Sequence, residues 1–227
     1  MAEDDAAASG VIAGEAVPPP TMLHLSTLTW VKGRVIHRIH DKQYPGGAFN
    51  PGVRGNARFS PIKDSGGMPI PTLYGGDDFE CAAMETVFHD VPYTAGIKFY
   101  DKGKLADATY TQLVAATDLL LADLGSKALR KLGVQRCQLI DTEKDQYPVT
   151  RLWAEAIHAR HPDVQGLCWT SRQDDGAKAL VLFGDRVRDG CLKQVSVPAS
   201  LTGHADCYGH LLALAEHIGV QIVPGRM

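Results

Sequence analysis

The sequence predicts a single α+β domain, with strands clustered towards both ends of the chain and helices in the middle. Its 227 residues match the size of one large domain. Apolar residues make up 44% of the chain and charged residues 22%, so a sizeable core can be buried. Strand-like alternation of apolar and polar residues is found before residue 110 and after residue 165, and helical spacing dominates between them.

Residues 1–22 are expected to form a disordered tail, and residues 23–227 the folded domain. The tail is rich in Ala, Gly, Pro and acidic residues, ends in Val17-Pro18-Pro19-Pro20 and has no periodic apolar pattern. Its acidic start is unlike a signal peptide, and no apolar run approaches the roughly 20 residues that cross a membrane. We therefore expect a cytoplasmic protein.

Within the domain, each element is predicted from its periodicity. The predicted strands alternate or are rich in β-branched residues, and they are 35–38, 72–74, 96–100, 105–109, 166–171, 177–183, 192–197 and 220–223. The predicted helices have apolar residues three or four positions apart, and they are 77–88, 111–124, 126–132, 147–159 and 206–218. Asp77 or Asp78 can cap the first of these helices. A cleft is expected between the two groups of strands.

Composition and motifs exclude several kinds of site. The 23 basic and 26 acidic residues give a net charge of -3, so the chain has no general attraction for nucleic acids or anionic lipids. The five cysteines are widely spaced without a Cys-x-x-Cys, which argues against a disulfide framework or a zinc site. No glycine-rich phosphate loop, zinc-protease motif or nucleophile elbow is present. His37 and His40 would lie on opposite faces of a strand, so no metal is expected.

A few polar residues stand out from this background. They are Arg38, Arg58, Tyr74, Glu85 and Ser171. Taken singly, each can be a surface or turn residue. Glu85 is the most unusual, because Ala82 and Phe88 place it on a stripe of small and apolar side chains. Carboxylates are seldom buried without a partner, so a functional role and a structural role are both open for Glu85.

These residues lie in stretches that together resemble a known family. The stretches are 37–39 with Tyr44, 49–51, 55–60, 72–74, 82–87, 150–154, 166–172 and 179–183. In this order they resemble the RES domain, a bacterial toxin family named for Arg, Glu and Ser positions. The resemblance covers about residues 34–185 and implies a compact α+β fold related to diphtheria-type ADP-ribosyltransferases, with a cleft for NAD. The tail, residues 111–145 and the segment after residue 190 depart from the compact members.

The resemblance also implies an activity. Members of the family degrade NAD by hydrolysis or phosphorolysis of the nicotinamide–ribose bond, and a helix-turn-helix antitoxin of the Xre type typically neutralises them. By this resemblance, the chain is an NAD glycohydrolase or NAD phosphorylase, with NAD as substrate and no metal. Transfer of ADP-ribose to a protein and a non-catalytic NAD-binding module remain open. The additional segments leave the partner and the oligomeric state open, including a homo-oligomer.

Roles for the five residues follow from the same resemblance. Glu85, with Arg38 and Tyr74, would form the catalytic group, because a carboxylate can stabilise the positive charge that grows on the ribose. Arg38 and Arg58 would bind the pyrophosphate. Tyr74 would stack on the nicotinamide, and Ser171 would hydrogen-bond to it or to the ribose. Alternatively, Arg38 and Glu85 would form a buried structural ion pair.

Overall fold

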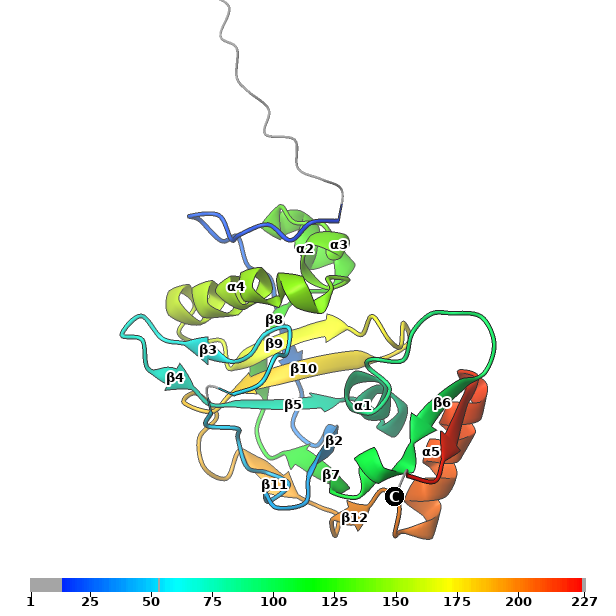
Figure 1. The fold of residues 1–227 in the computed structure, drawn as a ribbon. Helices are drawn as coiled ribbons and strands as arrows, with labels where there is room; N and C mark the ends of the chain where they lie inside the picture. The colour runs from blue at the N-terminus through cyan, green and yellow to red at the C-terminus, as the bar shows by residue number, and fades with distance from the viewer. Residues whose placement is uncertain (1–13, 53, 226–227) are drawn as a thin grey trace, which may run out of the picture.

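A curled mixed sheet runs through the computed structural model, which describes residues 14–52 and 54–225 (Figure 1). Its strands, in spatial order, are β1 (Thr27–Trp30), β8 (Leu119–Asp123), β9 (Gly166–Thr170), β10 (Lys178–Phe183), β5 (Thr72–Gly76), β2 (Val35–Asp41), β7 (Ala108–Ala115) and β11 (Leu192–Gln194), and β12 (Ala199–Ser200) also pairs with β7. The β8–β9 pair is parallel, and the other neighbours in this sheet are antiparallel.

Helices and two small sheets surround this main sheet. The helices are α1 (Phe79–Thr86), α2 (Ser126–Leu132), α3 (Arg136–Leu139), α4 (Tyr147–Arg160) and α5 (Ala205–His217), with short 3-10 turns η1 (Lys102–Leu105) and η2 (Lys144–Gln146). The small sheets pair β3 (Ile62–Lys63) with β4 (Pro69–Ile70), and β6 (Lys98–Asp101) with β13 (Val220–Val223). Figure 1 shows α2, α3 and α4 gathered beside β8 and β9, and α5 next to β6.

The strand register divides the main sheet into two faces. Tyr74 is paired with Val181, and His37 with Gly76, so Tyr74, Val181 and His37 point to the same side. We call this side the helix face, because its side chains pack against the helices. The other side, which we call the opposite face, carries a second buried cluster that includes Ile36 and Leu180.

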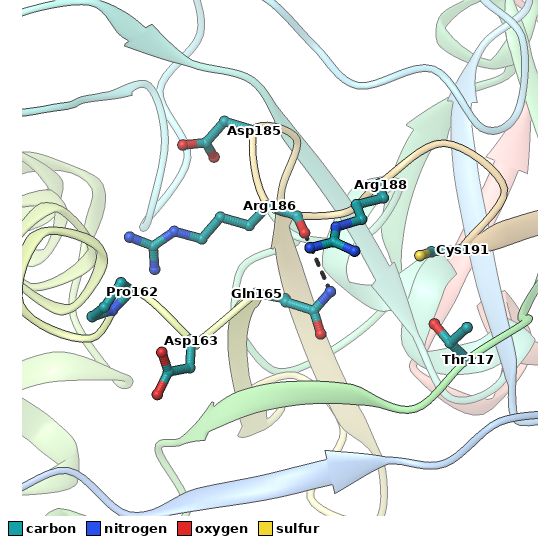
Figure 2. Close-up of a pocket in the computed structure, with 8 residues that line it drawn as sticks. All are labelled: Thr117, Pro162, Asp163, Gln165, Asp185, Arg186, Arg188 and Cys191. Carbon is teal, nitrogen blue, oxygen red and sulfur yellow. Dashed lines mark hydrogen bonds between the residues drawn. The ribbon is translucent and has the colours of Figure 1, made fainter.

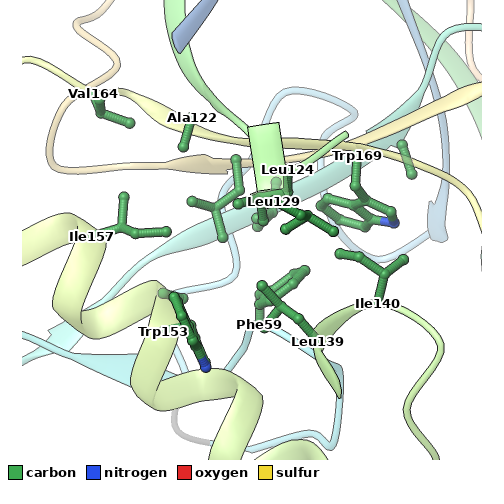
Figure 3. Close-up of a cluster of buried hydrophobic side chains, with 14 of the residues drawn as sticks. Phe59, Ala122, Leu124, Leu129, Leu139, Ile140, Trp153, Ile157, Val164 and Trp169 are labelled. Atoms are coloured by element: carbon green, nitrogen blue, oxygen red, sulfur yellow. The ribbon is translucent and has the colours of Figure 1, made fainter. Parts of the chain in front are cut away.

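The core on the helix face holds the segment that precedes β3 (Figure 3). Phe59, Trp153 and Trp169 are fully buried there, beside apolar residues of α2, α3 and α4. The Phe59 ring meets the Trp169 ring edge-on, with 5.1 Å between their centres. Since Phe59 follows Arg58 directly, burial of its ring fixes where the Arg58 backbone lies.

Most of the predicted elements are confirmed, and α1 shows why. Its first turn is capped by Asp78, whose carboxylate accepts a hydrogen bond from the Cys81 backbone N–H at 2.7 Å. Cys81, Ala82 and Ala83 are buried, which matches the small apolar stripe in the sequence. The predicted helices at 126–132, 147–159 and 206–218 correspond to α2, α4 and α5. The α+β class is therefore confirmed.

The helix predicted over 111–124 is wrong, because this segment forms most of β7 and all of β8. Burial alternates strictly along β7, as expected for a strand with one face on the core. Thr109, Tyr110, Thr111 and Val114 are β-branched or aromatic and fit a pleated surface better than a helix. The strand predicted over 105–109 is also displaced, since β7 begins at Ala108.

The two groups of strands do not enclose the expected cleft between them, because they are joined into one sheet. β5 from the first half of the chain pairs edge to edge with β10 from the second half, over five residues of each strand. The two groups therefore join into one sheet. This joining brings the end of β9 close to α1, although the two lie far apart in the sequence.

Residues 14–22, expected to be disordered, lie along α4 instead. The Trp153 indole Nε1–H donates to the Val17 carbonyl at 2.6 Å, and Arg160 donates to the Pro20 carbonyl at 2.6 Å. Val17 also packs against the core on the helix face. A proline run offers carbonyl acceptors from an extended backbone, and α4 supplies the donors. The expected tail at 1–13 lies outside the described residues.

A truncation measures the contribution of this segment. Compared with a chain that begins at residue 14, a chain that begins at residue 23 should melt roughly 5 °C lower, because the buried Trp153 indole of α4 loses its hydrogen-bond partner. Differential scanning calorimetry of both chains checks this. Equal melting temperatures would show that residues 14–22 contribute nothing to the folded domain.

None of the helices in the described part of the chain is long and apolar enough to span a membrane.

Candidate active site

The structure brings Arg58, Tyr74, Glu85 and Ser171 together on the helix face, from four separate elements. Glu85 is near the end of α1, and Ser171 follows the last residue of β9. Tyr74 lies on β5, and Arg58 precedes β3. A direct hydrogen bond joins Glu85 to Ser171, and the charges of Arg58 and Glu85 both act on the Tyr74 phenol.

Ser171 holds the Glu85 carboxylate in place. Its hydroxyl donates to Glu85 Oε1 at 2.6 Å, a length typical of a charge-assisted bond. The Ser171 hydroxyl oxygen also accepts hydrogen bonds from the backbone N–H groups of Gln173 and Asp174, at 3.0 and 3.1 Å. Ser171 is fully buried, and its one donor and two acceptor positions are all used. This geometry favours orientation of Glu85 over direct contact of Ser171 with a ligand.

Two arginines fix the turn that carries Ser171. Arg136, the first residue of α3, donates to the carbonyls of Thr170 and Ser171, both at 3.1 Å. Arg172 donates to the Thr142 carbonyl at 2.6 Å and to the Glu143 carboxylate at 2.7 Å. The backbone before and after the Ser171 side chain is therefore held in place, and this fixes where its hydroxyl lies.

Tyr74 is a neutral phenol within this cluster. Burial raises its pKa to about 12, opposed by hydrogen bonds with Ser60 and Phe59 and by the positive charge of Arg58. Its oxygen accepts the Phe59 backbone N–H at 3.0 Å, and its ring lies edge-on to the Trp169 ring. Tyr74 thus connects the sheet to the segment that carries Arg58.

Arg58 is a buried cation, and two of its three side-chain nitrogens have no partner among the described residues. Only 3% of the residue is exposed, and residues 14–52 and 54–225 supply no hydrogen-bond partner for its Nε and Nη2. Among the described residues, no carboxylate lies within the 4.0 Å of an ion pair with it. An unpaired buried charge is costly, so this arrangement favours a ligand that brings a negative charge.

Arg38 lies elsewhere, because it points to the opposite face of the sheet. Its neighbour His37 shares the helix face with Tyr74, and adjacent strand residues point to opposite sides. The Arg38 guanidinium donates to the carbonyls of Gly46 and Ala48, at 2.6 and 2.7 Å, and so holds the loop after β2. Burial lowers its pKa to about 10, which still leaves it charged at neutral pH. The described residues contain no Arg38–Glu85 ion pair, and contact of Arg38 with a ligand stays a prediction.

The two histidines of β2 also point apart. His37 pairs with the Tyr110 hydroxyl at 2.7 Å on the helix face, and His40 with the Thr111 hydroxyl at 2.9 Å on the opposite face. Across residues 14–52 and 54–225, no group of three His, Cys, Asp or Glu side chains is arranged to hold a metal ion.

Sequence reasoning missed two aromatic side chains at this site. Tyr147 begins α4, and its ring lies 5.4 Å from the guanidinium carbon of Arg58. His89 binds the Tyr147 hydroxyl through Nε2 at 3.1 Å. The four-residue spacing from Glu85 to His89 is a helical spacing that could have drawn attention to His89. Nothing in the sequence distinguishes Tyr147 from other tyrosines.

One surface hollow lies away from this site (Figure 2). It encloses about 500 Å³ and is lined by Thr117, Pro162, Asp163, Gln165, Asp185, Arg186, Arg188 and Cys191. Arg186 binds the segment that follows α4, where it donates to the carbonyls of His161 and Val164, both at 2.7 Å. A second hollow lies over α2 and α3. Neither hollow includes any of the five residues predicted from the sequence.

Comparison with known proteins identifies the family of the chain. A family model described as the RES domain matches residues 35–202, well over half of the chain. The matched segment contains all five predicted residues and the whole cluster around Glu85. No curated protein matches the sequence. The chain therefore belongs to the RES domain family.

Proposed function

We propose that this protein degrades NAD by cleaving the bond between nicotinamide and ribose. The observation that carries this proposal is the Glu85 carboxylate, held at 2.6 Å by the Ser171 hydroxyl, together with the buried Arg58, whose Nε and Nη2 find no partner in the described part of the chain. NAD has a matching pattern of charge, since cleavage creates a positive charge on the ribose and the pyrophosphate is an anion. The fixed Glu85 carboxylate can stabilise the positive ribose, and the Arg58 guanidinium can bind the anionic pyrophosphate.

The reaction needs no metal, because nicotinamide leaves as a neutral molecule. The C–N bond breaks, and its electron pair neutralises the positive pyridinium ring. Glu85 stabilises the cation that develops on the ribose and accepts a hydrogen bond from a ribose hydroxyl. In hydrolysis, a water oxygen forms the new bond to the ribose and its proton passes to the solvent. In phosphorolysis, an anionic phosphate oxygen forms this bond and has no proton to lose. Hydrolysis yields ADP-ribose, and phosphorolysis yields its phosphate ester.

The other members of the cluster bind and orient the substrate. Arg58 offers Nε and Nη2 as a planar fork to the pyrophosphate. Tyr74, neutral and partly exposed, offers its ring to the nicotinamide. Ser171 acts through Glu85, since its hydroxyl is already committed.

Product analysis tests the proposal. Purified protein is incubated with NAD, with and without phosphate, and with a candidate protein acceptor that would carry a label from the ADP-ribose part. Free nicotinamide without labelled protein supports NAD degradation, and the second product distinguishes hydrolysis from phosphorolysis. Nicotinamide release together with labelled acceptor would assign the protein as an ADP-ribosyltransferase. NAD binding without turnover would make it a binding module.

We further propose that the protein acts as a toxin controlled by a helix-turn-helix partner of the Xre type. A partner that offers a carboxylate to Arg58 would imitate the pyrophosphate and block the site. Expression of the protein alone should deplete NAD and stop growth, and co-expression of the adjacent gene product should restore growth. Unchanged NAD levels and growth on expression alone would contradict the toxin function.

A further inference from the structure

Arg58 is held at both ends by the first turn of α4. The Tyr147 ring faces its guanidinium, with 5.4 Å from the guanidinium carbon to the ring centre. Three residues further along α4, the Thr150 hydroxyl donates to the Arg58 carbonyl at 2.5 Å. Tyr147 and Thr150 are both buried, at 1% and 0% exposure, so neither side chain can turn away to solvent. The position of the cation thus depends on α4 as well as on its own loop.

A chain of hydrogen bonds fixes the orientation of the Tyr147 ring. The Tyr147 hydroxyl meets His89 Nε2 at 3.1 Å, and His89 Nδ1 meets the Asp90 carboxylate at 2.7 Å. Lys144, just before α4, completes the chain with an ion pair to Asp90 at 2.6 Å. Both ring nitrogens of His89 are therefore used, Nδ1 by Asp90 and Nε2 by the Tyr147 phenol. The hydroxyl is therefore engaged, and the face of the ring is left for Arg58.

His89 also connects this support to the carboxylate side of the site. It lies four residues after Glu85, just beyond the end of α1. Its backbone carbonyl accepts the Gln173 side-chain amide at 3.3 Å, and the Gln173 backbone N–H donates to Ser171. His89 therefore contacts the supports of both Arg58 and Glu85.

We propose that Tyr147, oriented by His89, is a positioning residue that holds the Arg58 guanidinium ready for a pyrophosphate group. The proposal rests on the proposed function, in which Arg58 binds the pyrophosphate of NAD. A ring face attracts a guanidinium without using its N–H groups, so contact with Tyr147 leaves the donor capacity of Nε and Nη2 unused. A cation already held in place loses less conformational entropy when the anion binds, and affinity rises accordingly.

Two substitutions at residue 147 test this proposal. Tyr147→Leu removes the ring, and Tyr147→Phe keeps the ring but loses the hydroxyl. Tyr147→Leu should raise KM for NAD and the Kd for inorganic pyrophosphate by roughly tenfold, with kcat within about twofold. Tyr147→Phe should raise both constants only about threefold. Kinetics on nicotinamide riboside, which has no pyrophosphate, should not change in either variant.

A matched control is available at the other end of α1. The Tyr110 hydroxyl binds His37 Nδ1 at 2.7 Å, a tyrosine–histidine pair outside the proposed machinery. Tyr110→Phe should therefore leave KM for NAD and pyrophosphate affinity at the wild-type values. Melting curves for all the variants show whether the fold is kept. If Tyr147→Leu does not fold, Tyr147→Phe and His89→Gln decide, and both should weaken pyrophosphate binding about threefold.

Titration with inorganic pyrophosphate separates this proposal from the proposed function. A wild-type protein that binds pyrophosphate but does not cleave NAD contradicts the NAD-degrading function. The role of Tyr147 is then tested by the Kd for pyrophosphate alone. A folded Tyr147→Leu variant with wild-type pyrophosphate affinity overturns the role of Tyr147, whatever the activity. A wild-type protein that does not bind pyrophosphate overturns it as well.

Discussion

Glu85→Gln is expected to lower kcat for NAD cleavage roughly a thousandfold, with NAD affinity within about threefold of wild type. Glutamine keeps the shape of the side chain and removes its charge. The charge is needed most in the transition state, when the ribose becomes positive, and least when the intact substrate binds. Steady-state release of nicotinamide gives kcat, and a direct binding measurement gives the affinity.

Two companion variants make this result specific. Glu80→Gln changes an exposed carboxylate on the same helix and should leave kcat unchanged. Ser171→Ala leaves the Glu85 charge but removes the bond that orients it, so kcat should fall by an intermediate factor of roughly thirty. Turnover by Glu85→Gln at a near wild-type rate would exclude Glu85 from the chemistry. An unfolded Glu85→Gln protein would instead indicate a structural role.

The sequence was sufficient to predict the local elements that carry Glu85. The Asp78 cap and the small residues Ala82 and Ala83 are local signals, and α1 follows them directly. It did not predict the bond between Glu85 and Ser171, which are 86 positions apart. That contact depends on the pairing of β5 with β10, and such pairing is decided by packing across the whole sheet.

Two failures have the same origin, because tertiary contacts decided between local alternatives. Residues 111–124 carry leucines at spacings that fit a helix, but pairing of β7 with β2 along seven residues stabilises a strand. The proline run at 18–20 has no apolar period, yet the Pro20 carbonyl finds a donor on α4. In neither segment does the sequence alone identify the partner.

The position of Arg38 was the feature hardest to predict from the sequence. Alternation along β2 shows that His37 and Arg38 point to opposite sides, but it does not show which side carries Glu85. The single pairing of His37 with Gly76 settles this in the structure. The family resemblance implied that Arg38 and Arg58 both bind the pyrophosphate, and the structure gives them different surroundings.

Arg58→Ala is therefore expected to raise KM for NAD roughly a hundredfold, since a charge-assisted contact with the pyrophosphate is lost. Arg58→Lys keeps the charge but loses the planar fork, so a rise of roughly tenfold is expected. Neither variant should affect cleavage of nicotinamide riboside, which lacks the pyrophosphate. Steady-state kinetics on the two substrates measure the difference. Equal losses on both would contradict a pyrophosphate site at Arg58.

Arg38→Lys provides the matched comparison, because the same substitution is made on the other face of the sheet. Both bonds to Gly46 and Ala48 come from Nη1, and a lysine ammonium ends one bond short of that position, so the loop after β2 should loosen. The melting temperature should fall by a few degrees, roughly 3 °C. Any loss of activity should then be the same for NAD and nicotinamide riboside. A loss confined to NAD would instead show that Arg38 reaches the pyrophosphate, and that the loop it holds moves aside when the substrate binds.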